Sequence, residues 1–224
     1  MLKDTRAGSL GAAGLLALAG GFLDGFTYVG HGQVFANSMT GNVVLLGVHL
    51  VSGAWQHAFR HIPPILAFLA GIWASQAILQ SKLRGVNAYL TVLLLEIAIL
   101  SALSFLPAAF PDWLFTLNIA LAASVQVQTF RDVNGHSYNS TFTTGNLRTL
   151  SEAAFSWIFE GHSPKAKDVL RDFSVICAAF LLGAMAGGYA VSRFGNHALW
   201  GEIALLAFVA ITTTTQASAV GQNR

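Results

Sequence analysis

Hydrophobic residues fall into eight long runs along the chain, with short polar segments between them. The runs cover residues 9–29, 34–55, 62–79, 88–106, 113–130, 142–159, 169–191 and 198–212. Each run is close to the roughly 20 apolar residues that a helix needs to cross the hydrocarbon core of a bilayer. The pattern therefore predicts an all-α integral membrane protein, and the runs divide evenly into four and four.

Short motifs recur in the same order in the two halves. Thr40-Gly41-Asn42 returns as Thr144-Gly145-Asn146, an Ala-Phe-Leu block at 67–69 returns at 179–181, and Glu-Ile-Ala at 96–98 returns at 202–204. Repeats inside so hydrophobic a chain are typical of transporters, whose binding site lies where the repeats meet. We expect one membrane domain over residues 1–224, with a first repeat at 9–106 and a second at 113–216.

The composition supports this class and argues against several others. Of the 224 residues, 54% are hydrophobic and only 10% are charged, and the mean hydropathy is +0.59, whereas about 25% of an ordinary soluble domain is charged. The net charge of +2 is small and the basic residues lie in short loops, so nucleic-acid binding is not expected. The sequence has no nucleophile elbow, P-loop, dinucleotide or zinc-protease motif, so we expect neither an enzyme nor a cofactor.

The basic residues predict which runs cross the membrane. If the second run of each half re-enters without crossing, about six spans remain and both termini are cytoplasmic. Apart from Arg148, which lies in a re-entrant run, nine basic residues are then inside and two, Arg60 and Arg193, are outside; the nine are Lys3, Arg6, Lys82, Arg84, Arg131, Lys165, Lys167, Arg171 and Arg224. Eight spans would give a weaker split, so the positive-inside rule favours six. Three spans per half also make the two halves an inverted-topology repeat.

The two Thr-Gly-Asn motifs are interpreted as breaks in membrane helices. Asn or Thr can cap a helix start, and glycine permits the backbone angles that a break requires. Half-helices beginning near Asn42 and Asn146 would direct the positive ends of their dipoles into the protein, where they attract anions or carboxylates. The alternative is that Gly41 and Gly145 only allow neighbouring helices to approach closely.

Three acidic residues lie inside the runs, where a carboxylate at the bilayer centre costs at least about 2.5 kcal/mol. Asp24 is a candidate for a cationic substrate or a proton, and a pair with Arg131 is one option. Glu96 lies in the middle of its run and is a proton-coupling candidate, whereas Glu202 is near enough to the start of its run to reach water. For each acid, the alternative is a hydrogen-bonded brace between helices.

These residues together predict a central polar site and no metal centre. His57 and His61 are four residues apart but flank Arg60 in a short loop, and no further ligand completes a zinc set. We expect the histidines to lie in loops or at the membrane interface. The polar site is expected to contain Asp24, Thr40, Gly41, Asn42, Gln126, Thr144, Gly145 and Asn146, with Glu96 as its coupling residue.

The segment Ala19-Gly20-Gly21-Phe22-Leu23-Asp24-Gly25, followed by the two Thr-Gly-Asn motifs, resembles the signature of the bacterial YoaK family, the DUF1275 membrane proteins. Residues 126–131 and 141–146, together with Glu96, resemble the same family, so the likeness covers nearly the whole chain. It departs at Gly25, Ser124 and Val127, where the family often has other residues. The resemblance implies a bacterial inner-membrane protein of about six spans.

The leading interpretation is a small-solute transporter, embedded in the lipid bilayer, with a polar site at the interface of its two repeats. The alternative is a structural or partner-binding membrane protein without transport activity, which would need only packed helices. The sequence patterns name no solute, coupling ion or oligomeric state.

Overall fold

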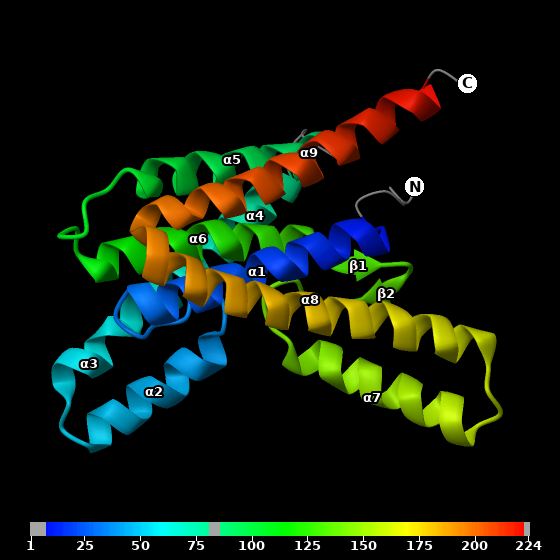
Figure 1. Ribbon diagram of the computed structural model, residues 1–224, viewed down its shortest axis with the longest axis horizontal. Helices are drawn as coiled ribbons and strands as arrows, with labels where there is room; N and C mark the ends of the chain where they lie inside the picture. Colours follow the sequence, from blue (N-terminus) through cyan, green and yellow to red (C-terminus); the bar gives the residue numbers. More distant parts are fainter. Residues whose placement is uncertain (1–7, 81–85, 222–224) are drawn as a thin grey trace.

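The computed structural model of the chain describes residues 8–80 and 86–221, and helices make up nearly all of this part (Figure 1). The helices are α1 (Leu10–Gly30), α2 (Met39–Val51), α3 (Trp55–Arg60), α4 (Ile62–Gln80), α5 (Val86–Ser104), α6 (Asp112–Thr129), α7 (Thr144–Phe159), α8 (Pro164–Phe194), the short 3-10 turn η1 (Gly195–Ala198) and α9 (Leu199–Gly221). Two short antiparallel strands, β1 (Asp132–Val133) and β2 (His136–Ser137), form a hairpin between α6 and α7. The predicted all-α class is confirmed.

The second hydrophobic run differs from the prediction, because it is not one helix. Residues 34–38 are an irregular segment ahead of α2, and Gly53, with a φ of +75°, separates α2 from α3. Glycine adopts a positive φ without the steric cost that other residues incur, and for this reason helices often end at a glycine. The β1–β2 hairpin was also not predicted, although Asn134 and Gly135 both have positive φ, as a tight hairpin turn requires.

The long helices pair across the two halves of the chain. α1 packs along α8, α4 packs along α6, and α5 packs along α9, while α2 lies against α4 and α7 against α8 (Figure 1). Each pairing has a counterpart when the first half is exchanged for the second. The hydrophobic core therefore forms mainly from residues of α1, α5, α6 and α9.

The α1–α8 contact is very close, because glycines from both helices lie in it. A Cβ atom added at Gly21 or Gly25 would collide with the α8 backbone, and one added at Gly183 or Gly187 would collide with the α1 backbone. Small residues at such positions let membrane helices approach each other. Gly183 and Gly187 therefore act as packing positions between α8 and α1.

Two groups of residues define the ends of the bundle. At one end, called here the hairpin end, the Asn134 backbone N–H donates to the Gly8 carbonyl and its side chain donates to Asp172 at 2.6 Å. At the other, called the His31 end, His31 contacts the start of α6 and the turn between α8 and α9. Arg60, the last residue of α3, lies beside Gly32 at this end.

Helices α2 and α7 are short and begin part-way along the bundle. Figure 1 shows α2 running from the middle of the long helices toward the His31 end, and α7 running from the middle toward the hairpin end. Both therefore start where the predicted breaks were placed, close to the Thr-Gly-Asn motifs.

The outer surface carries many large apolar side chains. They occur on α2, α4, α5, α7, α8 and α9, and include Trp73, Leu181, Met185, Phe208 and Ile211. By length and composition, three helical segments of the described chain can cross a membrane: Leu10–Gly30, Trp55–Gln80 and Pro164–Thr213. So much exposed apolar surface is typical of a protein whose surroundings are lipid.

Candidate functional site

The asparagine of each Thr-Gly-Asn motif fastens the chain seven residues upstream. The Asn42 amide donates to the Phe35 carbonyl at 2.7 Å, and its oxygen accepts the Phe35 backbone N–H at 3.0 Å. Asn146 makes the same two bonds to Asn139, at 2.6 and 3.0 Å. Because both amides are buried and bonded to backbone, their observed role is to shape the segment that precedes each short helix.

Asp24 holds the start of α2 against the middle of α1. Its Oδ1 accepts the backbone N–H of Asn37 at 2.7 Å and that of Ser38 at 3.4 Å, and its Oδ2 accepts the Ser38 hydroxyl. A carboxylate that accepts backbone N–H groups at a helix start is also favoured by the helix dipole. The partner of Asp24 is thus the irregular segment 34–38 ahead of α2, called here the first broken segment, rather than Arg131. The corresponding irregular segment 138–143 ahead of α7 is called the second broken segment.

The two broken segments meet at Gly20 of α1. Asn37, from the first segment, donates its side-chain amide to the Gly20 carbonyl at 2.9 Å. From the second segment, Ser140 and Thr141 lie so close that a Cβ atom at Gly20 would overlap the Ser140 carbonyl oxygen and come within 2.9 Å of the Thr141 Cα. The absence of a side chain at Gly20 is what allows the second segment to reach the centre of the bundle.

Two buried polar side-chain atoms close to Gly20 lack hydrogen-bond partners. Asn37 Oδ1 and Thr141 Oγ1 are buried and have no hydrogen-bond partner among the described residues. The two residues are 104 positions apart, which is the spacing of the two Thr-Gly-Asn motifs, so they occupy matching places in the two halves. A buried polar atom without a partner is costly, and a polar molecule or water bound next to it would satisfy it.

A second polar group joins this point to the core. Gln126 of α6 lies between Ser140 and Glu96 of α5: its Nε2 is 3.3 Å from Ser140 Oγ and 3.5 Å from the Leu16 carbonyl. When the amide is turned by half a rotation, its nitrogen donates to the two Glu96 oxygens at 2.9 and 3.0 Å. Glu96 is fully buried, at 0% exposure.

Glu202 corrects one prediction. It was expected to reach water, but it is only 1% exposed, and neither carboxylate oxygen has a hydrogen-bond partner among the described residues. The reason is that α9 continues directly from the turn η1, so its first residues are covered by the core instead of protruding. Glu202 and Glu96 are both buried, on the packed helices α9 and α5, so their ionised forms would repel each other.

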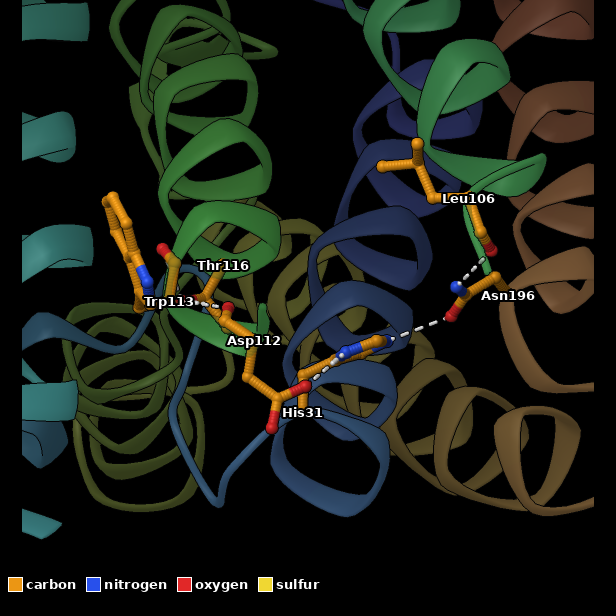
Figure 2. A network of polar contacts seen from close by, with 6 residues as sticks. All are labelled: His31, Leu106, Asp112, Trp113, Thr116 and Asn196. Carbon is orange, nitrogen blue, oxygen red and sulfur yellow. Dashed lines mark hydrogen bonds and ion pairs between the residues drawn. The ribbon is translucent and has the colours of Figure 1, made fainter. Parts of the chain in front are cut away.

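His31 joins three elements at its end of the bundle, as Figure 2 shows. Its Nδ1 lies 3.0 Å from Asp112 Oδ1, and its Nε2 lies 3.1 Å from Asn196 Oδ1. Asn196 in turn donates to the Leu106 carbonyl at 2.9 Å, and the Phe115 ring stacks on the imidazole with centroids 3.8 Å apart. Burial lowers the pKa of His31, since the contacts with Asp112 and Asn196 offset only part of the desolvation. His31 lies in the turn that directly follows α1, as expected for a loop histidine, but it is buried rather than open to water.

Comparison with known proteins identifies the family. A family described as "Protein of unknown function (DUF1275)" matches residues 12–212. The chain belongs to this family. It is 26% identical over 212 residues to the UPF0700 transmembrane protein YoaK of Bacillus subtilis (strain 168), a match that covers 91% of this chain and 93% of the relative. No solved structure shows significant similarity to the chain.

Of the polar residues predicted for the site of this DUF1275 protein, the structure gathers only some. Asp24 and Gln126 each bond to a broken segment close to Gly20. The motif threonines, Thr40 and Thr144, are exposed, as is Gly145, while Gly41 lies against the Phe35 ring. Within the described chain, no hydrogen bond or ion pair joins one Thr-Gly-Asn motif to the other, so a shared binding role for them stays a prediction.

Sequence reasoning missed Asn37, Ser140 and Thr141, and it named Glu202 but placed it within reach of water. A signal existed for Glu202, because Glu-Ile-Ala is repeated and its first copy contains the mid-run acid Glu96. No equivalent signal existed for Asn37, Ser140 and Thr141, whose importance comes from the long-range contact with Gly20.

Proposed function

We propose that this DUF1275 protein is a membrane transporter for a small solute, with its polar site where the two broken segments meet at Gly20. The observation that carries the proposal is the pair of matching buried groups, Asn37 Oδ1 and Thr141 Oγ1, left without partners at that point. Transporters with inverted repeats bind their substrates near the bilayer midplane, between broken helices of the two halves. Asp24 and Gln126 border the same point and are assigned to the site with them.

The proposed architecture is an inverted repeat of six spans, α1, α4, α5, α6, α8 and α9, with α2 and α7 as re-entrant half-helices. The exchange of partners between the halves supports it, because α1–α8 corresponds to α6–α4 and α5 pairs with its own counterpart α9. The identical bonds of Asn42 and Asn146 support it as well.

The coupling residue in this proposal is Glu96, and the buried Glu202 joins it. Helices α1, α4, α5, α6 and α9 contain no lysine or arginine, yet they carry four acidic residues: Asp24, Glu96, Asp112 and Glu202. Ionisable residues without a basic partner inside a membrane domain commonly mark ion or proton pathways. No enzymatic chemistry is part of the proposal.

One observation favours the alternative, a structural or partner-binding protein. Three cavities are prominent, of about 470, 370 and 290 Å³, and they lie at the His31 end, between α7 and α8, and beside the hairpin. None of these three is lined by Asp24, Asn37 or Gln126. A transporter in this conformation is closed to both sides, whereas a scaffold stays closed permanently.

The test compares metabolites in cells that lack the protein and in cells that overproduce it, followed by uptake of each altered solute into proteoliposomes. Asn37→Ala and Thr141→Val remove the matching polar atoms and are expected to abolish uptake of the solute. Glu152→Gln, on the exposed face of α7, is the matched control and should transport normally. Failure of every altered solute to enter proteoliposomes of folded protein would favour the scaffold.

A further inference from the structure

We propose that Glu96 is a proton-binding site and that the Gln126 amide transmits its protonation state to Ser140 in the second broken segment. The inference deepens the proposed function and rests on it for the use of the proton. The binding of the proton itself can be measured without any solute.

Among the described residues, the helices and the turn that pack around Glu96 carry no lysine or arginine that could neutralise it. Helix α5 packs against α4, α6, α9 and η1. Helix α4 has no charged residue; α6 has only Asp112, which contacts His31 at the end of the bundle; α9 has only Glu202; and η1 has the exposed His197. Tyr89 is the other titratable residue of α5. Two nearby buried carboxylates cannot both remain ionised at low cost under these conditions, so one of them must bind a cation or a proton.

The Gln126 amide has two orientations, and each fits one protonation state of Glu96. With its nitrogen toward Glu96, the amide donates to both carboxylate oxygens at 2.9 and 3.0 Å, which suits an ionised Glu96. With its nitrogen toward Ser140 Oγ and the Leu16 carbonyl, its oxygen faces Glu96 instead. An amide oxygen needs a donor, and Glu96 can donate only when it is protonated.

Rotation of the Gln126 amide changes its hydrogen bond to Ser140, which belongs to the second broken segment. When Glu96 is protonated, the amide nitrogen donates to Ser140 Oγ; when Glu96 is ionised, the amide oxygen faces the same hydroxyl, which must then be the donor. Ser140 lies directly against Gly20 and precedes Thr141. Loss of the proton therefore changes the hydrogen bond that holds this segment next to the proposed solute site.

A proton fits this site better than a metal ion. Hard cations such as Ca²⁺ and Mg²⁺ are held by about six or more oxygen ligands, and the side chains present here are two carboxylates and one amide. In the described part of the chain, no three histidine, cysteine or acidic residues form a metal-binding group. The residues of α5 and α9 next to the carboxylates belong to the apolar core, including Val92, Leu93, Leu199 and Ile203.

The test is infrared spectroscopy of purified protein in lipid, with ¹³C in the glutamate side-chain carboxyl. A protonated carboxyl group shows a C=O stretch that a carboxylate lacks, and the label separates glutamate from aspartate. We expect this band at neutral pH, its loss in Glu96→Gln, and its retention in Glu152→Gln. Gln126→Leu should shift the band, because it removes the hydrogen-bond partner of Glu96, whereas Gln128→Leu on the same helix should leave it unchanged.

Three results would overturn the inference. They are the absence of a protonated glutamate at any pH at which the protein is folded, a band that survives Glu96→Gln, and a band that disappears when sodium is added at constant pH. The last result would indicate a metal cation at the site. If the band behaves as expected but no solute is transported, the proton site stands and the proposed transport function fails.

Discussion

The Asp24 carboxylate accepts hydrogen bonds from the backbone N–H groups of Asn37 and Ser38 and from the Ser38 hydroxyl. Asp24→Ala should therefore lower the free energy of unfolding by about 2 kcal/mol or more, because it leaves buried N–H groups without an acceptor. Asp24→Asn keeps one side-chain oxygen as acceptor for the two backbone N–H groups, and its amide N–H can donate to the Ser38 hydroxyl oxygen. Asp24→Asn should therefore lower the free energy of unfolding clearly less than Asp24→Ala does. The melting temperature of purified protein in detergent measures both. Equal losses in the two variants would contradict this role for the acceptor.

The Asp24→Asn variant also distinguishes a structural role of Asp24 from a role in transport. If the charge of Asp24 serves the solute, Asp24→Asn should fold and insert normally yet abolish transport, since an amide neither titrates nor carries charge. Uptake of the identified solute into proteoliposomes is the measurement. A variant that transports at the wild-type rate would reduce Asp24 to a brace for α2.

His31 is expected to make the protein less stable as the pH falls. Burial places its folded-state pKa below the ordinary 6.5, so the unfolded chain binds the proton more readily than the folded protein. The stabilisation is therefore complete above the unfolded pKa and is lost as pH falls below it. Between about pH 7 and about pH 5, the melting temperature should fall less in His31→Gln than in the wild type. His136→Gln, in the hairpin at the other end, is the control and should follow the wild type. A His31→Gln profile identical to the wild type would show that another group controls the pH dependence.

At the level of elements, the sequence identified the breaks but not what holds them. Helices beginning close to the Thr-Gly-Asn motifs were predicted, and α2 and α7 begin at Met39 and Thr144. The asparagines were expected to cap these helices, but they instead bond to backbone seven residues upstream. Those bonds depend on the path of an irregular segment, which local sequence preferences do not determine. The hairpin was more accessible, because Asn134-Gly135 is a common hairpin turn sequence.

Gly20 tests the proposed meeting of the two broken segments. A methyl group there would collide with the Ser140 carbonyl and approach the Thr141 Cα, so Gly20→Ala should cost about 1–3 kcal/mol through overpacking. Gly11→Ala, on the same helix, has no atom within 4 Å of the added carbon and should be neutral or slightly stabilising, because alanine favours helix more than glycine does. Melting temperatures of the two variants in detergent provide the comparison. Similar values would mean that the second segment does not press on α1.

At the scale of the whole molecule, the two ends of the bundle differ in their number of basic residues. Arg60 and Arg193 lie near the His31 end, while Arg131, Lys165, Lys167 and Arg171 lie near the hairpin end. The remaining basic residues that the sequence assigned to the cytoplasm, Lys3, Arg6, Lys82, Arg84 and Arg224, lie outside the described residues. The alternation of α1, α4, α5, α6, α8 and α9 between the two ends is what six crossings require. Under the proposed six-span architecture, the positive-inside rule predicts that the hairpin end is cytoplasmic.

Cysteine labelling in whole cells tests this orientation, on a Cys177→Ala background that removes the chain's own thiol. Ser81→Cys, in the connection between α4 and α5, should react with a membrane-impermeant maleimide only after the cells are permeabilised. Ala108→Cys, in the exposed loop between α5 and α6 at the His31 end, should react in intact cells. Positions 81 and 108 precede and follow α5 in the chain. In a six-span protein α5 crosses the membrane between them, so only one of the two can face the outside. Reaction at Ser81→Cys in intact cells would reverse the orientation or require that α2 also crosses, and in either case the basic residues would no longer account for the topology.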